Sequence, residues 1–314
     1  MTLTQLEIFA LVAEMQGFTA AAARLGISQS GVSHAVRELE RELGVELLQR
    51  RQGRVELTDI GRQLLPRASG MLGLAEAMRQ EAADARGLRR GTLRIGSFGP
   101  TSSMRLLPAL LARYRQQYPG IEVHIDEGPD EQVLQWLLER RVDIAFAVLP
   151  DPRFVCCPLV EDQMVAVLPA GHRLADRPRV TLTELCGEPF ALSGAGSAEL
   201  VMRLFQAARL QPNIRYRCGQ LLSTLDTVAR GDAVAIVAEL SLPSRPHAEG
   251  YVGKPLQPAV RRQVGLALLD GDQASPAARA FLQIADRLRI EGGLAGLNAR
   301  ENGRPDRSAR FFMP

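Results

Sequence analysis

The sequence predicts an α/β protein in which a mainly helical N-terminal domain with a helix-turn-helix precedes a two-lobed α/β domain. Three patterns support this prediction. Short helical segments broken by glycines occupy residues 4–43, a long helical pattern starts after residue 58, and short apolar runs then alternate with amphipathic helices up to residue 290. Apolar residues three and four positions apart indicate helices, and alternating strands and helices indicate a parallel sheet covered on both faces.

The composition excludes several classes of protein. The chain has 314 residues, of which 46% are hydrophobic and 23% charged, which is typical of soluble globular proteins with two or three domains. No apolar run reaches the roughly 18 residues of a membrane-spanning helix, and the N-terminal residues lack the pattern of a secretory signal. We therefore expect a cytoplasmic protein that binds no membrane. The net charge of +3 favours no particular partner.

The first helices form a helix-turn-helix pattern. A broad apolar stripe predicts a helix over residues 4–16, and Thr19 is placed to cap a short second helix that ends at Gly26. Ser28 can cap a third helix that runs to about Leu43. Two such helices joined by a tight turn that contains glycine are typical of a helix-turn-helix.

A hairpin and a long helix follow. Alternating residues after position 44 predict a short hairpin, here called the wing, with its tip near Gln52 and Gly53. The arginines that flank this tip are Arg50, Arg51 and Arg54. Thr58 is placed to cap a long helix to about residue 86, in which apolar residues recur as in a coiled-coil seam. We expect this linker helix to mediate dimerisation.

The remaining residues predict two lobes of similar size. Strand and helix patterns repeat over residues 92–149 and again over 164–240, and the strand at 261–270 and the helix at 277–290 return to the first lobe. The last residues lack any period and predict a flexible tail. The predicted domains are 1–58, the helix-turn-helix domain; 59–91, the linker helix and hinge; 92–290, the two-lobed domain; and 291–314, the tail.

The second helix of a helix-turn-helix presents its N-terminal residues to base edges in the major groove. The residues so placed are Ser28, Gln29, Ser30, Ser33, His34 and Arg37. Gln29 could read adenine, Arg37 could bind guanine or a phosphate, and the short serines let the helix approach the DNA closely. In the alternative reading, Ser28 and Gln29 only cap the helix, and Arg37 pairs with Glu40 on a solvated face.

The stretch from Leu3 to Gly61 resembles the winged helix-turn-helix of LysR-type transcriptional regulators. The residues that carry the resemblance are Phe9, Gly17, Phe18, Thr19, Ala21, Ala22, Leu25, Ser28, Gln29, Ser33, Leu39, Glu40, Leu43, Gly44, Leu47, Thr58 and Gly61. The sequence departs from the family pattern at Ser30, Gly31 and His34. The resemblance implies that the three wing arginines hold phosphates, the alternative being a solvated charged hairpin tip.

The resemblance extends to about Ile290 and implies the fold of periplasmic solute-binding proteins, with an effector held between the two lobes. The segment 94–104 places hydroxyl groups at a strand end and at a helix N-terminus, where free N–H groups favour a small anion or carboxylate. In the alternative reading, Thr101 and Ser102 are only N-caps. The six candidate effector contacts are Ser97, Thr101, Ser102, Ser103, Ser193 and Ser223. At Arg140 the family commonly has glycine.

We therefore expect a regulator of transcription. A homodimer would bind double-stranded DNA at an interrupted inverted repeat, and the resemblance implies homotetramers on DNA, with RNA polymerase as a further candidate partner. A small-molecule effector between the lobes would control it. The chain has no phosphate-binding loop, nucleophile elbow or dinucleotide fingerprint, and no Cys or His spacing suited to a metal. We expect no enzyme, no cofactor and no metal site.

Three alternatives stay open at this point. Cys186 and Cys218 could make the protein a redox-sensing regulator, which requires a partly exposed thiol with a lowered pKa. Buried, inert cysteines are the structural alternative to that reading. A two-lobed α/β domain could also belong to an enzyme or to a solute-binding protein without any regulatory role.

Overall fold

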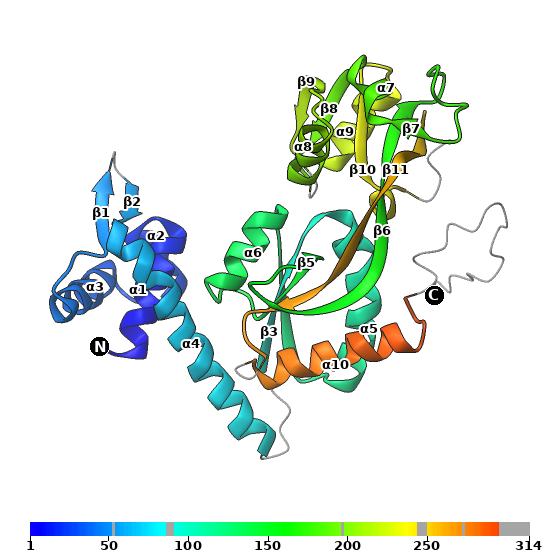
Figure 1. Cartoon of the computed structure of the whole chain (residues 1–314). Coiled ribbons are helices and arrows are strands. Elements are labelled where there is room, and N and C mark those ends of the chain that lie inside the picture. The colour runs from blue at the N-terminus through cyan, green and yellow to red at the C-terminus, as the bar shows by residue number, and fades with distance from the viewer. Residues whose placement is uncertain (52–53, 86–90, 196–197, 244–249, 272–273, 295–314) are drawn as a thin grey trace, which may run out of the picture.

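The computed structural model describes residues 1–51, 54–85, 91–195, 198–243, 250–271 and 274–294. A small helical domain, one long helix and a two-lobed α/β domain follow one another along the chain (Figure 1). Among the described residues, no helix is both long enough and apolar enough to cross a membrane.

The N-terminal domain has the predicted helix-turn-helix and wing. Its elements are α1 (Leu3–Met15), α2 (Phe18–Leu25), α3 (Gln29–Leu43), β1 (Leu48–Arg51) and β2 (Arg54–Leu57). Ser28 caps α3 as predicted, because its Oγ accepts a hydrogen bond from the Gly31 N–H at 3.1 Å. The prediction that Thr19 caps α2 is wrong, since α2 begins at Phe18 and its N-cap residue is Gly17. The tip of the wing lies outside the described residues.

The linker helix α4 (Asp59–Ala85) starts at a tight junction with the wing. Thr58 Oγ1 accepts a hydrogen bond from the Gly61 N–H at 3.0 Å and donates one to Glu46 O at 2.7 Å. A Cβ atom at Gly61 would lie 2.1 Å from Leu47 O, closer than atoms can approach. Only glycine therefore allows α4 to pass so close to the wing. In the same region Ala68 of α4 joins the core of the N-terminal domain.

The α/β domain has the two predicted lobes. Lobe I contains β3 (Gly91–Ser97), η1 (Thr101–Leu106), α5 (Leu107–Gln117), β4 (Ile121–Glu127), α6 (Asp130–Leu138), β5 (Ile144–Leu149) and α10 (Pro276–Ile290). Lobe II contains β7 (Val180–Thr181), α7 (Leu182–Cys186), β8 (Pro189–Ser193), α8 (Ala198–Ala207), β9 (Asn213–Cys218), α9 (Leu221–Ala229), β10 (Val234–Ala238) and η2 (Glu239–Ser241). Two long strands, β6 (Val155–Pro169) and β11 (Tyr251–Leu268), run through both lobes (Figure 1).

The sheet is mixed, whereas the sequence predicted a parallel one. The strand order is β4-β3-β5-β11-β6-β10-β8-β9, with β7 beside β11. Strands within each lobe pair in parallel, but β6 and β11 pair with each other and with β5 and β10 antiparallel. β6 passes from lobe I into lobe II, where it pairs antiparallel with β10, and β11 returns to lobe I, where it pairs antiparallel with β5.

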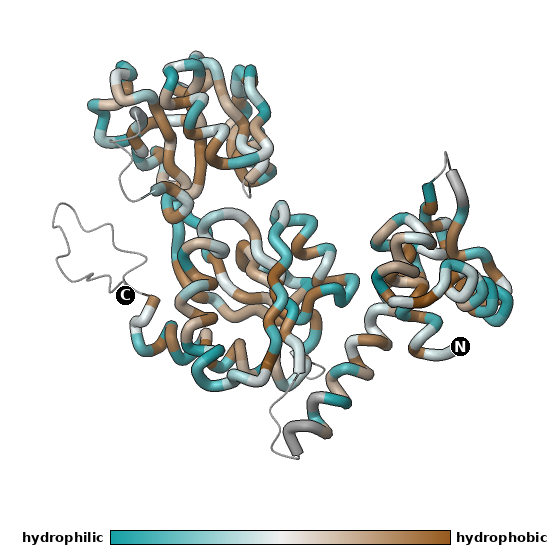
Figure 2. The backbone as a smooth tube through the Cα atoms, turned by 180° about the vertical axis from the view of Figure 1, so that it is seen from behind, coloured by the Kyte–Doolittle hydropathy of each residue, from teal (hydrophilic) through white to brown (hydrophobic). Residues whose placement is uncertain are grey.

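Each lobe has its own hydrophobic core. Along β6, Met164 and Ala166 pack with α7 and α8 on one face of the lobe II sheet, while Val165 and Val167 pack with α9 on the other. This alternation is the period of a strand with both faces covered. In lobe I, Tyr114 of α5 is fully buried among strands and α10. Figure 2 shows hydrophobic segments inside both lobes and hydrophilic segments on the outside.

The helical part of lobe I begins with an unusual turn. η1 is a π-helical turn that runs directly into α5, and its N-cap residue Pro100 provides no side-chain cap. The alternative reading in which Thr101 and Ser102 serve as N-caps is therefore wrong. Such turns are rare and are frequent at functional sites.

Lobe I contacts the N-terminal part of the chain. Arg141 lies 3.6 Å from Glu14 of α1, and Arg279 of α10 lies 3.2 Å from Glu81 of α4. The neighbouring Arg140 packs against α4, because a Cβ atom at Gly70 would lie 3.2 Å from its Cδ. Arg140 has a φ of 54°, in the left-handed region that favours glycine. Among the tail residues, 291–294 form turns and the rest lie outside the described residues, as do residues 86–90 of the predicted hinge.

A buried ion pair joins the two crossing strands between the lobes. Arg262 of β11 donates from Nε and Nη2 to Asp162 Oδ2 of β6, at 3.0 and 2.8 Å, and both side chains are almost fully buried. Asp162 Oδ1 accepts from the backbone N–H of Gln163 and Leu240, at 2.9 and 3.1 Å. Arg262 also donates to Thr101 Oγ1 at 3.1 Å. The network thus links both strands to η1 of lobe I and η2 of lobe II.

Removing one partner of this ion pair is expected to destabilise the protein more than removing both. Arg262→Met leaves the Asp162 carboxylate buried without its counter-charge, which typically costs about 3–5 kcal/mol. The double variant Arg262→Met with Asp162→Leu is expected to recover most of that loss. Urea unfolding followed by the fluorescence of Trp136, the single tryptophan, measures both. If the free energy of unfolding of Arg262→Met lay within about 1 kcal/mol of the wild-type value, this role of the ion pair would be contradicted.

Candidate DNA-binding surface and interlobe cavity

One face of α3 presents the predicted DNA-binding residues to solvent. Gln29, Ser30, His34 and Arg37 are exposed, and Ser33 is half-buried. The apolar residues Val32, Val36 and Leu39 on the opposite face are buried in the domain core. The spacing of three and four residues gathers the polar side chains into one row along the helix. Such a row is what a helix needs to enter a DNA groove.

Arg37 stays at this surface and does not pair with Glu40. Its Nε donates to Ser33 O at 3.2 Å, and its Nη2 donates to Ser33 Oγ at 3.1 Å. Glu40 Oε1 instead accepts from the backbone N–H of Leu47 and Leu48, at 2.7 and 3.1 Å. Glu40 therefore fixes the start of the wing against α3, and the alternative reading of an Arg37–Glu40 pair is wrong.

The start of α3 and the wing complete this surface. Besides capping α3, Ser28 Oγ shares a hydrogen bond of 3.0 Å with Ser30 Oγ, so both hydroxyls hold the first turn. In the wing, Arg50 pairs with Val55 and Arg51 pairs with Arg54 across the two strands. The Arg54 side chain is exposed, whereas the side chains of Arg50 and Arg51 lie outside the structural description. Contact between these residues and DNA stays a prediction.

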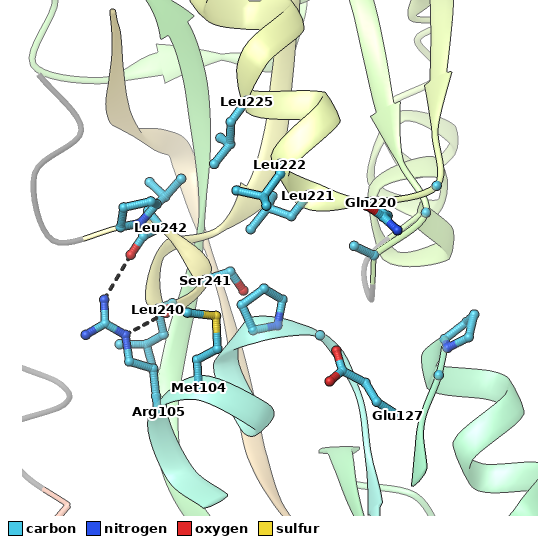
Figure 3. Close-up of a pocket in the computed structure, with 18 residues that line it drawn as sticks. Met104, Arg105, Glu127, Gln220, Leu221, Leu222, Leu225, Leu240, Ser241 and Leu242 are labelled. Carbon is cyan, nitrogen blue, oxygen red and sulfur yellow. Dashed lines mark hydrogen bonds between the residues drawn. The ribbon is translucent and has the colours of Figure 1, made fainter. Parts of the chain in front are cut away.

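A cavity of about 760 Å³ lies between the lobes, and we call it the interlobe cavity. Lobe I lines it with residues 99–100, 104–105 and 127–129, and lobe II with residues 194–195, 219–222, 225 and 240–243. Figure 3 shows the side chains of both lobes around this space. A concave site of this size is suited to one small organic ligand.

None of the six predicted effector contacts lines the interlobe cavity. Ser97 is fully buried, and its Oγ forms hydrogen bonds of 3.1 and 2.8 Å with the hydroxyls of Ser102 and Ser103. Ser102 Oγ also accepts from the Phe98 N–H at 3.0 Å and donates to Phe98 O. These serines stabilise the loop between β3 and η1, and residues beside them in that loop face the cavity.

The other three predicted contacts have different surroundings. Thr101 Oγ1 shares a hydrogen bond of 2.7 Å with Ser241 Oγ, which joins lobe I to lobe II. Ser193 is buried, and its Oγ accepts from the Ala195 N–H at 3.4 Å. Ser223 is exposed on α9. A direct contact between the effector and any of the six residues stays a prediction.

The cavity lining is mainly apolar, which the sequence did not predict. The polar side chains in it are Arg105, Glu127, Gln220 and Ser241. Leucines, prolines, glycines, Ala195 and Met104 provide the rest. The sequence did contain a signal for one lining residue, Leu222. This leucine lies outside the buried stripe of α9, so its exposure could have been predicted. For Met104, which lies in the π-helical turn η1, the sequence contained no such signal.

Carboxyl groups of both lobes meet beside the cavity. Burial raises the pKa of Asp130 at the start of α6 to about 6, an effect that the charge of Arg262 partly opposes. Asp130 Oδ1 is buried and makes no hydrogen bond to the residues that the structure describes. A hydrogen bond to Glu199 of α8 raises the pKa of Glu131. Carboxyl groups from α6 of lobe I and α8 of lobe II therefore lie close to each other across the two lobes.

The cysteines have few features of reactive thiols. All four are free and half-buried. Burial raises the pKa of the Cys157 and Cys186 thiols, which lowers the fraction of reactive thiolate at neutral pH. Among the described residues, no group of three or more His, Cys, Asp and Glu side chains is placed to hold a metal ion.

Two family models match the chain, one for each domain. The model described as a bacterial regulatory helix-turn-helix protein of the lysR family matches residues 3–62. The model described as the LysR substrate binding domain matches residues 86–289. The two matches have the same order as the helix-turn-helix domain and the two-lobed domain of this structure.

Similar proteins extend these matches. The uncharacterized HTH-type transcriptional regulator YvbU of Bacillus subtilis is 33% identical over 92% of this chain and 99% of its own length. A probable hydrogen peroxide-inducible genes activator of Mycobacterium xenopi is 39% identical over 57% of this chain and 95% of its own. A full-length OxyR variant from Pseudomonas aeruginosa superposes with a TM-score of 0.71, at 24% identity, over 92% of this chain and 95% of that one. The last likeness shows a shared fold.

Asp130 is expected to make stability depend on pH. The folded protein holds the Asp130 proton up to about pH 6, whereas the ordinary value is 3.8, so stability falls as the pH rises between these values. A shift of this size corresponds to about 3 kcal/mol. Asp130→Asn should therefore equal the wild type near pH 4 and exceed its stability at pH 8, measured by urea unfolding.

The control for this prediction is Asp176→Asn, which removes a carboxylate from an exposed position in lobe II. It should change stability little at either pH. An Asp130→Asn variant that is no more stable than the wild type at pH 8 would show that the ionised carboxylate is not costly there.

Proposed function

The chain belongs to the LysR family of bacterial DNA-binding transcriptional regulators, and on that premise we propose how it recognises DNA and what controls it. Members of this family are regulators and not enzymes, which removes the enzyme alternative. The chain is accordingly a transcriptional regulator with an effector-binding domain. A regulator acts where chromosomal DNA lies, so we place it in the cytoplasm.

We propose that α3 enters the major groove and that the wing holds the DNA backbone. The exposed row on α3 carries this proposal, because it holds donors and acceptors without any apolar side chain between them. Gln29 would read a base edge, Arg37 would bind a guanine or a phosphate, and Ser30, Ser33 and His34 would face neighbouring bases. Arg50, Arg51 and Arg54 would bind phosphates, and Ser28 would bind through the turn that it caps.

The protein would act as a homodimer formed through the linker helix. Met71, Leu74 and Met78 of α4 are exposed, and Met78 is 71% exposed. They recur at intervals of three and four residues, so they form an apolar stripe that a second copy of α4 would cover. Two N-terminal domains would then bind an interrupted inverted repeat. Tetramers on DNA and contact with RNA polymerase are further parts of this proposal.

The effector would be a small carboxylate in the interlobe cavity. Arg105 supplies a positive charge there, and β6 and β11 provide the connection about which the lobes can move. A ligand that binds the closed arrangement better than the open one shifts the population toward the closed one. The contacts of lobe I with α1 and α4 would carry this change to the N-terminal domain.

Oxidant sensing through Cys186 and Cys218 is the second candidate. The observation that favours it is the likeness to the Mycobacterium xenopi protein named as a probable hydrogen peroxide-inducible genes activator. The raised pKa of the Cys186 thiol opposes it, because the thiolate is the form that reacts with oxidants. The carboxylate effector is therefore the candidate that we favour.

Arg37→Ala is expected to weaken DNA binding strongly, and Arg41→Ala is not. Arg41 is on the same helix but in its last turn, where it pairs with Glu38 and is 77% exposed. Loss of the Arg37 contact should lower the affinity for DNA about tenfold or more. If that contact is to a phosphate, the slope of log affinity against log salt concentration should become shallower by about one for each protomer. Fluorescence anisotropy with a labelled duplex at several salt concentrations measures both. Equal affinities of the two variants would exclude Arg37 from the DNA contact.

Mild oxidation is expected to leave DNA binding unchanged if the effector account holds. The test treats the wild type, Cys186→Ser and Cys218→Ser with hydrogen peroxide and compares their affinity for the same duplex. A peroxide response that disappears in either serine variant would favour the second candidate instead.

A further inference from the structure

Two of the most exposed large apolar side chains of the protein lie on opposite sides of the interlobe cavity. Leu222 of α9 is 74% exposed, and Met104 of η1 is 72% exposed. Among the described residues, only Met78 and Ile290 are comparable, at 71% and 70%. Figure 3 shows Met104 reaching toward the cavity from lobe I and Leu222 from lobe II. Two of the four most exposed large apolar side chains among the described residues thus line the same cavity, and exposed apolar surface of this kind often marks a binding site.

The wall behind Leu222 is also apolar. Leu221, Leu225 and Leu242 of lobe II also line the cavity and are buried, with exposed fractions of 7%, 3% and 1%, and Leu240 adds a further apolar side chain to the lining. Covering such a surface is favourable in proportion to the apolar area removed from water. A ligand with an apolar body would cover Met104 and Leu222 together, whereas a small, fully hydrated anion would cover neither.

The charges at the cavity are few and well separated. Among the described residues that line it, Arg105 is the only basic side chain and Glu127 the only acidic one. Arg105 donates from Nε and Nη2 to the carbonyl oxygens of Leu240 and Leu242, at 3.3 and 3.0 Å. Figure 3 shows Arg105 and Glu127 at opposite sides. A carboxylate can approach Arg105, but a second one at the far end of the ligand would meet Glu127 and be repelled.

We propose that the interlobe cavity binds a monocarboxylate whose extended apolar body, an alkyl or aryl chain, lies between Met104 and Leu222. The proposal rests on the proposed function, because it names the class of effector that the cavity takes. Its charged end would lie near Arg105, and its apolar body would extend between Met104 and Leu222 toward the side of the cavity where Glu127 lies, so a second carboxylate at that end would be repelled. Closure of the lobes would bring Met104 and Leu222 into contact with opposite sides of the ligand's apolar body.

The experiment is isothermal titration calorimetry of the full-length protein with a matched series of acids. Butanoate, hexanoate and octanoate differ only in chain length, and octanedioate has the length of octanoate with a second carboxylate. Each methylene that is buried should tighten binding about fourfold, so octanoate should bind at least tenfold tighter than hexanoate. Octanedioate should bind at least tenfold more weakly than octanoate.

Three variants locate the binding. Met104→Gln and Leu222→Gln each replace an exposed side chain, so both proteins should fold, and each should flatten the dependence of affinity on chain length. Ile290→Gln changes a side chain of similar exposure on α10, which does not line the cavity, and this variant should bind the acids like the wild type.

Each result decides the proposal. Affinity that rises with chain length in the wild type and in Ile290→Gln, but not in the two cavity variants, would support it. Affinity that does not rise with length, including no binding by any acid, would overturn it, as would a cavity variant that behaves like Ile290→Gln. Octanedioate that binds as tightly as octanoate would overturn the part that concerns Glu127. DNA binding by the same preparation would still support the proposed function in each of these cases.

Discussion

The two-lobed domain depends on the crossing of β6 and β11, because these strands belong to the sheets of both lobes. At the crossing, Arg262 and Asp162 form an ion pair almost without exposure to solvent. An ion pair in such a place adds little net stability but fixes geometry, since either charge alone would be costly. Here it fixes which residues of η1 and η2 meet: Asp162 accepts from the Leu240 N–H, and Arg262 donates to Thr101. Because Leu240 also lines the interlobe cavity, the same network fixes both the crossing of the two strands and one wall of the cavity.

Lobe I is a continuous body from the cavity to the N-terminal domain. Gly128 lines the cavity, and a Cβ atom there would lie 2.8 Å from the ring of Trp136. The Arg141 guanidinium lies 4.6 Å from the centre of that ring and also pairs with Glu14 of α1. A ligand that moves the start of α6 would therefore move groups in contact with the DNA-binding domain. Arg140 adds to this contact by packing on α4 despite its left-handed backbone.

The sequence predicted the order of elements well where local signals decide the structure. Ser28 and Thr58 cap the helices that they were expected to cap, because the cap hydroxyl and its backbone partner lie only three residues apart. The prediction for Thr19 was wrong, because α2 already begins at Phe18, which packs against the core of the N-terminal domain. The full lengths of β6 and β11 were not predicted. Pro255 lies where the register of β11 shifts, and proline argues against a strand when only local sequence is considered.

The site was predicted in outline but not in its residues. The sequence pointed to the loop after β3, and this loop does border the interlobe cavity, but its serines turn inward to bond with each other. The lining is drawn from segments that are far apart in the sequence and that contacts between the lobes bring together, such as those of Arg105 with the carbonyl oxygens of Leu240 and Leu242. The periodicity of apolar residues within one segment cannot predict contacts of this kind between distant segments.

The most direct test of the whole account is selection of duplexes from random-sequence DNA by the full-length protein, followed by sequencing of the bound fraction. A dimer that reads DNA through α3 should enrich sequences with two half-sites in inverted orientation, whose centres are separated by about 10–10.5 base pairs or a multiple of this helical repeat. Enrichment of a single unpaired site, or of no sequence at all, would contradict a dimer that reads DNA through α3.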